Sequence, residues 1–189
     1  KVNVHDERNW LHSIEKVLCR SGFAYVWYNK GTQNERGFLK NFKIRLQDCY
    51  RQEWHDRINS SERFLLYSLF KRDFQCEKYL STICITKFRT AFTRFRLGRN
   101  NLKSNTFSTE DKLCPFCKDT IEDEYHFLLE CETYSEQRKK YLSKYIKCMR
   151  NMRCTMPFLI DGQGFLKTKN VAMYIYYAMK HRRLCFENA

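Results

Sequence analysis

Four side chains of the kinds that bind transition metals lie in one short segment, and this cluster constrains the fold more than any other sequence feature. Two residues separate Cys114 from Cys117, eight separate Cys117 from His126, and four separate His126 from Cys131. A Cys-x-x-Cys turn lets two thiolates hold a tetrahedral ion, and the second pair completes its coordination. Four protein ligands leave no position for substrate. The spacing therefore predicts one structural Zn²⁺ bound by Cys114, Cys117, His126 and Cys131.

Other interpretations of the cluster remain open. A Cys-x-x-Cys can be a redox pair, although nothing nearby indicates the βαβ setting of thioredoxin-like folds. His126 stands in an apolar run from Tyr125 to Leu129, where an isolated histidine is more often a hydrogen-bonded core residue. Iron is also able to occupy a site of thiolate and imidazole donors. Ligand type and spacing together favour zinc over these alternatives.

Few turn-forming residues accompany many core-forming ones. The 189 residues include only 6 glycines and 2 prolines, whereas 43% are hydrophobic and 16% aromatic. A many-stranded β-sandwich needs frequent turn residues, so this composition favours long helices around a packed core. The expected fold class is mainly α, a helical domain with a small embedded Cys-Cys-His-Cys zinc knuckle.

Apolar periodicity and capping residues place the expected helices along the chain. They cover residues 9–21, about 35–58, a stretch starting at 60 or 61, 86 to Gly98, about 134–150 and about 170–186. The apolar segment 23–28 is a strand or a helical turn. Thr133 and Glu136 form a capping box for the helix from 134, and a turn region surrounds Pro157, Gly162 and Gly164. Three regions are expected: 1–84, 85–150 with the basic helix, knuckle and following helix, and 151–189.

Positive charge points to a polyanionic partner. The 35 Lys and Arg residues exceed the 21 Asp and Glu residues by 14, and such a surplus destabilises the compact state unless a polyanion neutralises it. Nucleic acid is the favoured partner and an anionic membrane surface the weaker candidate. A merely solvated basic surface is the alternative. Two acid-free runs, 86–103 and 138–153, supply the candidate nucleic-acid-binding residues: Lys87, Arg89, Arg94, Arg96, Arg99, Lys103, Arg138, Lys139, Lys140 and Lys144.

The compartment is expected to be intracellular, nuclear or cytoplasmic. Most of the 10 cysteines lie in apolar runs, where a reduced thiol packs as a small hydrophobic group. The first residues resemble no signal peptide, and no apolar run approaches the roughly 18 to 20 residues that span a bilayer. Since the sequence does not begin with Met, we expect a fragment of a longer protein.

Two segments resemble a known family. The stretch LCPFCKDTIEDEYHFLLECETYSEQRKKYL is similar to the Cys-Cys-His-Cys zinc motif that follows the polymerase domain in reverse transcriptases of non-LTR (LINE-type) retrotransposons. The upstream stretch FRTAFTRFRLGRNNL resembles the Arg-rich segment that precedes this motif. The likeness covers about residues 85 to 146. It implies a C-terminal, non-polymerase part of such a polyprotein, or a gene derived from one. In that family this region grips template RNA or target DNA beside the polymerase domain.

Three function classes follow, in order of preference. The first is a non-catalytic nucleic-acid-binding module that contacts mainly phosphates of RNA or DNA. The second is a zinc-stabilised structural or protein-interaction module without nucleic-acid contact. An enzyme ranks last, because the zinc ligands are saturated and the sequence contains no Tyr-x-Asp-Asp. Residues 118–136 hold seven acids and one base, so the knuckle should repel phosphates and act as a clamp between two basic helices.

Overall fold

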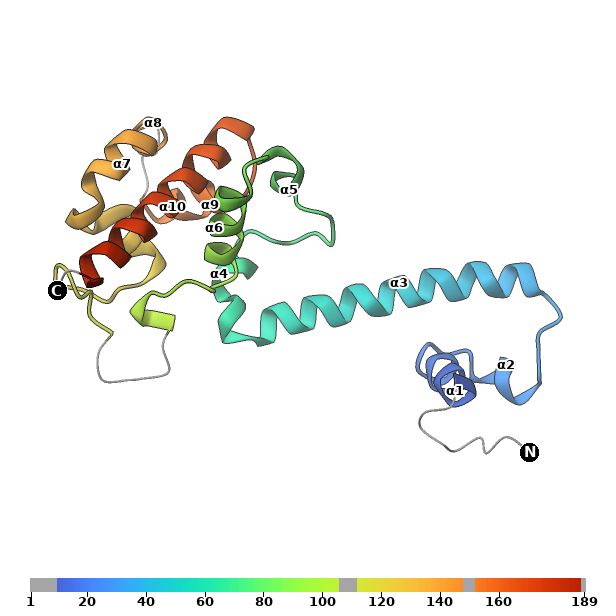
Figure 1. Cartoon of the computed structure of the whole chain (residues 1–189). Helices are drawn as coiled ribbons and strands as arrows, with labels where there is room; N and C mark the ends of the chain where they lie inside the picture. The colour runs from blue at the N-terminus through green and yellow to red at the C-terminus, as the bar shows by residue number, and fades with distance from the viewer. Residues whose placement is uncertain (1–9, 106–111, 148–151, 188–189) are drawn as a thin grey trace. The chain divides into compact units, whose positions relative to one another are not determined.

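The chain folds into helices joined by turns and loops (Figure 1). This computed structural model describes residues 10–105, 112–147 and 152–187, and within them no strand is present. The mainly α fold class is thus confirmed. The helices are α1 Trp10–Arg20, α2 Ala24–Tyr28, α3 Glu35–Ser60, α4 Leu65–Ser68, α5 Tyr79–Thr82, α6 Thr86–Arg96, α7 Ser135–Tyr141, α8 Ser143–Ile146, α9 Met152–Ile160 and α10 Phe165–Glu187. Short 3₁₀ turns cover Glu62–Phe64, Lys103–Asn105 and Glu132–Tyr134, and a π-helical turn covers His126–Glu130.

Two compact units divide the chain between residues 57 and 58. Unit 1 is Lys1–Arg57 and unit 2 is Ile58–Ala189. This division differs from the expected regions 1–84, 85–150 and 151–189. Tyr79, Phe92 and Tyr174 come from those three regions, yet they share one buried core in unit 2. The difference arises because segments distant in sequence pack together. Boundaries drawn from local composition do not include such packing.

Unit 1 is formed by short and long helices with little buried surface. Leu18 of α1 is its only buried hydrophobic residue among those described. Gly22 adopts φ +84, and the amide of Phe23 donates to the carbonyl of Leu18 at 2.8 Å. This left-handed residue ends α1 as the sequence predicted. The segment 23–28, which periodicity left undecided, forms helix α2.

Unit 2 has its core around α10, which packs against α6, α7 and α9 (Figure 1). The predicted stripe of Phe88, Phe92 and Phe95 is buried on α6. Gly98, with φ +61, follows the end of this helix, and the amide of Arg99 donates to the carbonyl of Arg94 at 2.8 Å. Both expectations for this helix are therefore confirmed, because burial and chain reversal are encoded locally.

Several helix boundaries differ from expectation. The single helix expected over 134–150 is broken into α7 and α8 at Leu142, which is fully buried and has φ −113; residues 148–150 lie outside the described ranges. Thr133 lies in a 3₁₀ turn, and no side chain caps α7. Pro157 lies inside α9 rather than in a turn. The chain turns instead at Gly162 and Gly164, with φ +77 and +74.

Candidate metal centre and basic groove

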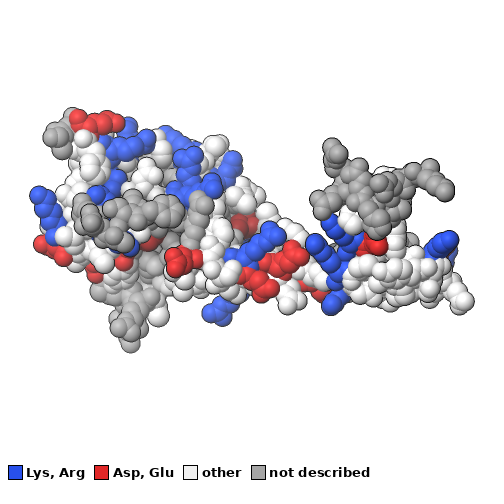
Figure 2. All heavy atoms as spheres, turned by 90° about the horizontal axis from the view of Figure 1, so that it is seen from below, with Lys and Arg blue, Asp and Glu red and all other residues white. Residues whose placement is uncertain are grey.

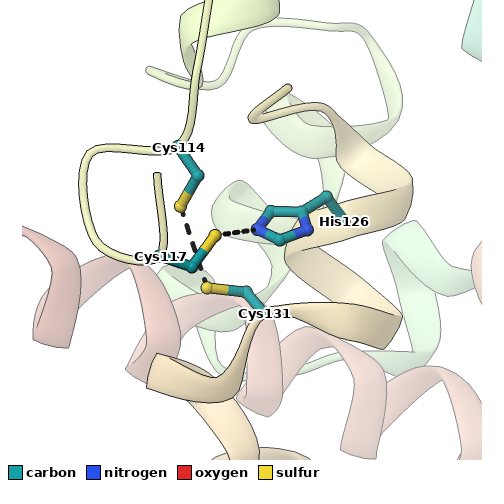
Figure 3. Close-up of side chains that lie close together, drawn as sticks. All are labelled: Cys114, Cys117, His126 and Cys131. Carbon is teal, nitrogen blue, oxygen red and sulfur yellow. Dashed lines mark hydrogen bonds between the residues drawn. The ribbon is translucent and has the colours of Figure 1, made fainter. Parts of the chain in front are cut away.

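Cys114 and Cys117 lie on a tight loop that an antiparallel bridge closes. The bridge pairs Leu113 with Ile121, and the amide of Cys114 donates to the carbonyl of Thr120 at 2.8 Å. The loop between them carries the two sulfur atoms on its inner side, toward the following helical turn (Figure 3). The Cys-x-x-Cys segment therefore forms the compact turn that its spacing predicted.

His126 and Cys131 come from the two ends of the π-helical turn (Figure 3). The amide of Cys131 donates to the carbonyl of His126 at 2.9 Å, five residues back. This wider turn carries residues five apart on one side, which an α-helical spacing of three or four does not achieve. The helical segment expected here is confirmed, but its π geometry was not predicted.

The four side chains converge closely enough to hold one metal ion. Their ligand atoms all lie within 4.8 Å of one another. The Sγ atoms of Cys114 and Cys131 are 3.8 Å apart, and Sγ of Cys117 is 3.3 Å from Nε2 of His126. Tetrahedral coordination at a Zn–S length of about 2.3 Å separates two sulfurs by about 3.8 Å. The residues predicted as ligands thus form a cluster that fits one metal ion.

A second layer of contacts orients the imidazole. Nδ1 of His126 lies 2.8 Å from Oγ1 of Thr120 and 3.4 Å from a carboxylate oxygen of Glu130. The amide of His126 donates to Asp123 at 2.7 Å. Thr120 and Glu130 engage Nδ1, Asp123 holds the backbone amide, and Nε2 is left facing the sulfur of Cys117. Metal-binding histidines are commonly fixed in this way through the second ring nitrogen.

The thiols differ in acidity because their surroundings differ. Burial raises the pKa of Cys114 to about 12. Burial also acts to raise the pKa of Cys117, but the backbone amide of Asp119 and other donors outweigh it, so this pKa lies below its usual value. A metal ion binds thiolates and displaces their protons. Ion binding here therefore releases protons, most directly at the buried Cys114.

A buried ion pair joins the knuckle to α10. Glu122 is fully buried, and its carboxylate accepts hydrogen bonds from Nε and an Nη of Arg182 at 2.8 and 2.7 Å. The same carboxylate accepts from the amide of Lys103 at 3.0 Å. Glu122 thus connects the knuckle, the segment after α6 and the last helix. In the sequence Glu122 is only one acid in an acidic stretch, since its partner lies 60 residues away.

Arg96 was predicted to bind nucleic acid, and its burial corrects this prediction. Its side chain is 1% exposed and donates to Glu77 at 2.9 Å and to the carbonyl of Asp161 at 3.4 Å. The guanidinium also lies 4.3 Å from the ring centroid of Phe70. Because these partners come from other segments, helical periodicity alone placed Arg96 on a basic outer face. The structure makes it a core cation instead.

Two further residues predicted to bind nucleic acid, Arg138 and Arg89, donate hydrogen bonds to backbone carbonyls instead. Arg138 donates to the carbonyls of Leu128 and Cys131 at 2.9 and 2.7 Å, at the end of the π-helical turn. Arg89 donates to the carbonyl of Ile83 at 3.2 Å. Both side chains are half-buried. Their guanidinium groups satisfy the orphan carbonyls at the ends of helical turns, which is a structural task.

A groove between α6 and α10 gathers other predicted cations. Lys87, Arg94 and Arg99 line it from the α6 side, and Arg183 of α10 lines it as well. All four side chains are exposed, the groove volume is about 380 Å³, and no described acidic residue lines it. We call it the α6–α10 groove. Arg183 was not among the candidates predicted from the sequence, where it is only part of a basic run at the end of the last helix.

The remaining candidates lie elsewhere on unit 2. Lys139 and Lys140 of α7 and Lys144 of α8 are exposed, whereas Lys103 is half-buried. None of these four residues lines the α6–α10 groove. Lys and Arg side chains are spread over much of the face of unit 2 that is in view in Figure 2, and Asp and Glu form smaller patches. The predicted cations therefore do not form one continuous site.

Comparisons with known proteins leave the geometry as the basis for function. No protein-family model matches the chain. No curated protein and no solved structure matches it either. Among the described helices, none combines the length and apolar character needed to cross a membrane.

Proposed function

We propose that the chain is a non-catalytic nucleic-acid-binding module that contacts mainly phosphates and carries one structural Zn²⁺. The α6–α10 groove carries this proposal, because four exposed cations line it without any described acid. Phosphate contacts from Lys and Arg supply most of the affinity of such modules. The motif resemblance supports attachment to a retroelement reverse transcriptase, whose polymerase domain is the proposed protein partner.

The proposed metal ion acts through the scaffold. Its four ligands would fill a tetrahedral shell and leave no position for chemistry. Seven acids between residues 118 and 136 make the knuckle unsuited to phosphate. Through Glu122 and Arg182, however, the knuckle is tied to α10, which forms one wall of the groove. Zinc would therefore support binding by holding α10 in place.

The test measures binding of the full zinc-loaded chain to a labelled RNA and a labelled DNA by fluorescence anisotropy, across a range of salt. The double variant Arg94→Gln with Arg99→Gln should weaken binding about tenfold and lower the salt slope by about two, since each phosphate contact contributes about 0.9 to the slope. The control, Arg36→Gln with Arg45→Gln, removes the same charge from exposed positions on α3. It should change affinity less than about twofold. Binding that ignores salt, or an equal loss in both variants, contradicts the proposal.

A protein-interaction module is the second candidate, and unit 1 supplies its supporting observation. Trp10, Tyr28 and Leu39 are 68%, 69% and 61% exposed. Exposed large apolar side chains mark a docking surface where they lie together in one patch, as this candidate requires. If the folded, zinc-loaded wild-type chain binds no nucleic acid at low salt, this second candidate replaces the first.

A further inference from the structure

The α6–α10 groove has an apolar floor beneath its charged rim. Ala91 and Phe95 of α6 and Ile175, Tyr176 and Met179 of α10 line it. Its volume of about 380 Å³ falls within the about 300–1,000 Å³ of small-ligand pockets. Phosphate contact alone requires only surface charge. An apolar floor of this size indicates that the ligand also carries a flat or apolar group.

Tyr176 presents an aromatic ring in a fixed orientation at this floor. Its ring centroid lies 5.3 Å from that of Phe88 and 5.3 Å from that of Tyr177, at interplanar angles of 78° and 80°. Nζ of Lys87 lies 5.2 Å from the ring centroid. The neighbouring rings hold Tyr176 in place before any ligand arrives, which lowers the cost of ordering it on binding. A fixed tyrosine beside cations is a typical stacking partner for a nucleic-acid base.

The rim offers phosphate ligands at more than one position. Arg94, Arg99 and Arg183 are exposed and form no ion pair with any acidic residue that the structure describes. One guanidinium group is able to bind two oxygens of a phosphate at the same time. Since these arginines come from both walls of the groove, a chain crossing it would meet cations on each side. The charge and the floor together match a nucleotide rather than a peptide.

We propose that the α6–α10 groove binds one unpaired nucleotide of a single-stranded nucleic acid. The base lies on the apolar floor against Tyr176, and the flanking phosphates contact Arg94, Arg99 and Arg183. A duplex keeps its bases stacked inside and offers mainly phosphates, so it leaves the floor unfilled. This inference rests on the proposed function and adds to it a preference for single strands over duplexes.

Two variants with unchanged charge test the floor, using the full zinc-loaded chain. Ala91→Leu fills the floor and Tyr176→Leu removes its aromatic ring. The probes are a labelled oligouridylate of about 12 nucleotides, within the usual footprint of single-strand binders, and an RNA duplex of equal length. We expect each variant to lose about tenfold in affinity for the single strand, as for the loss of one stacked base. Affinity for the duplex should change less than about twofold, because its phosphate contacts are untouched.

Thr86→Leu is the matched control, since it lies exposed on the same helix and does not line the groove. It should leave both affinities unchanged. Thermal unfolding and zinc content establish that each variant is folded, and either groove variant alone is sufficient if the other fails to fold. Equal binding of both probes, or full single-strand affinity in a folded groove variant, overturns this inference while the proposed function stands. Failure of the wild type to bind these two RNA probes and their DNA equivalents removes the proposed function itself.

Discussion

Units 1 and 2 are both helical, but they differ in what holds their helices. In unit 2, a continuous cluster of buried residues reaches from Tyr79 to Ala178. In unit 1, Leu18 is the only described hydrophobic residue that is buried. Since apolar burial supplies most of the free energy of folding, helix content alone says little about stability. The two units should therefore respond very differently to the same disturbance.

The contacts in each unit show the same contrast. Unit 1 has a small aromatic group in which Phe23, Phe38 and Phe42 lie 5.3–5.5 Å apart, all half-exposed. Unit 2 adds buried ion pairs and the candidate metal site to its core, as in the pair of Glu122 with Arg182. These contacts join residues distant in sequence. Unit 2 should therefore unfold as one cooperative body, whereas unit 1 depends on local helix formation.

Loss of the metal site should have the largest effect, and it should be confined to unit 2. The variant Cys131→Ser removes one ligand, and structural zinc contributes about 10–16 kcal/mol in small zinc domains at neutral pH. We expect loss of bound zinc, together with loss of amide-exchange protection in α6 and α10. Protection in α1 and in the part of α3 that lies in unit 1 should not change. Metal analysis and hydrogen exchange measure both outcomes.

Cys84→Ser is the control, because this cysteine is exposed and lies outside the cluster. It should keep its zinc and its protection. If Cys131→Ser retains one zinc ion and full protection, the assignment of Cys131 as a ligand is wrong.

Replacing one phenylalanine by alanine in each unit should show how differently the two cores are packed. Phe92 is fully buried, and its replacement by Ala should cost unit 2 about 3–5 kcal/mol of unfolding free energy. Phe38 is half-exposed, so Phe38→Ala should cost unit 1 only about 1 kcal/mol. Amide exchange in each unit reads out the two values. Equal costs would show that unit 1 has a tighter core than its burial indicates.

Acidification should release the metal ion. The metal-free site binds more protons than the loaded site, because the buried Cys114, with its pKa of about 12, is protonated at neutral pH. Affinity therefore rises with pH and falls as pH falls, by about tenfold per pH unit for each displaced proton. Competition with a chromogenic chelator between about pH 6 and 8 measures this slope. An affinity independent of pH would contradict thiolate coordination.

The smallest effect concerns Tyr134, whose ring is fully buried while its hydroxyl lacks a hydrogen-bond partner among the described residues. Burial is the main reason that the pKa of Tyr134 lies far above its usual value. An unsatisfied buried hydroxyl costs about 1–3 kcal/mol. Tyr134→Phe should thus leave the stability of unit 2 unchanged or raise it by up to about 1 kcal/mol. Thermal unfolding measures the change, and a clear loss of stability would indicate a partner for this hydroxyl.

Local features of the site and fold were predictable from the sequence. Spacing and donor type identified the cluster that the structure brings together, namely Cys114, Cys117, His126 and Cys131. Helical periodicity identified the buried stripe of Phe88, Phe92 and Phe95, and glycine marked the ends of α1 and α6. Each of these depends on residues within a few turns of one another, which is the range that a linear pattern describes.

Only the tertiary structure decided which charged side chains are buried and which are exposed. Arg94 and Arg96 are two residues apart on one basic helix, yet Arg94 is exposed at the groove and Arg96 is buried against Glu77. Likewise, Arg182 is paired with Glu122 while the adjacent Arg183 is exposed. A charge enters the core only where a distant segment supplies its counter-charge, because burial without a partner costs too much. The sequence by itself determined most of the helices, the four clustered cysteine and histidine residues and the total charge. The pairing of distant segments determined which cations remain for a partner.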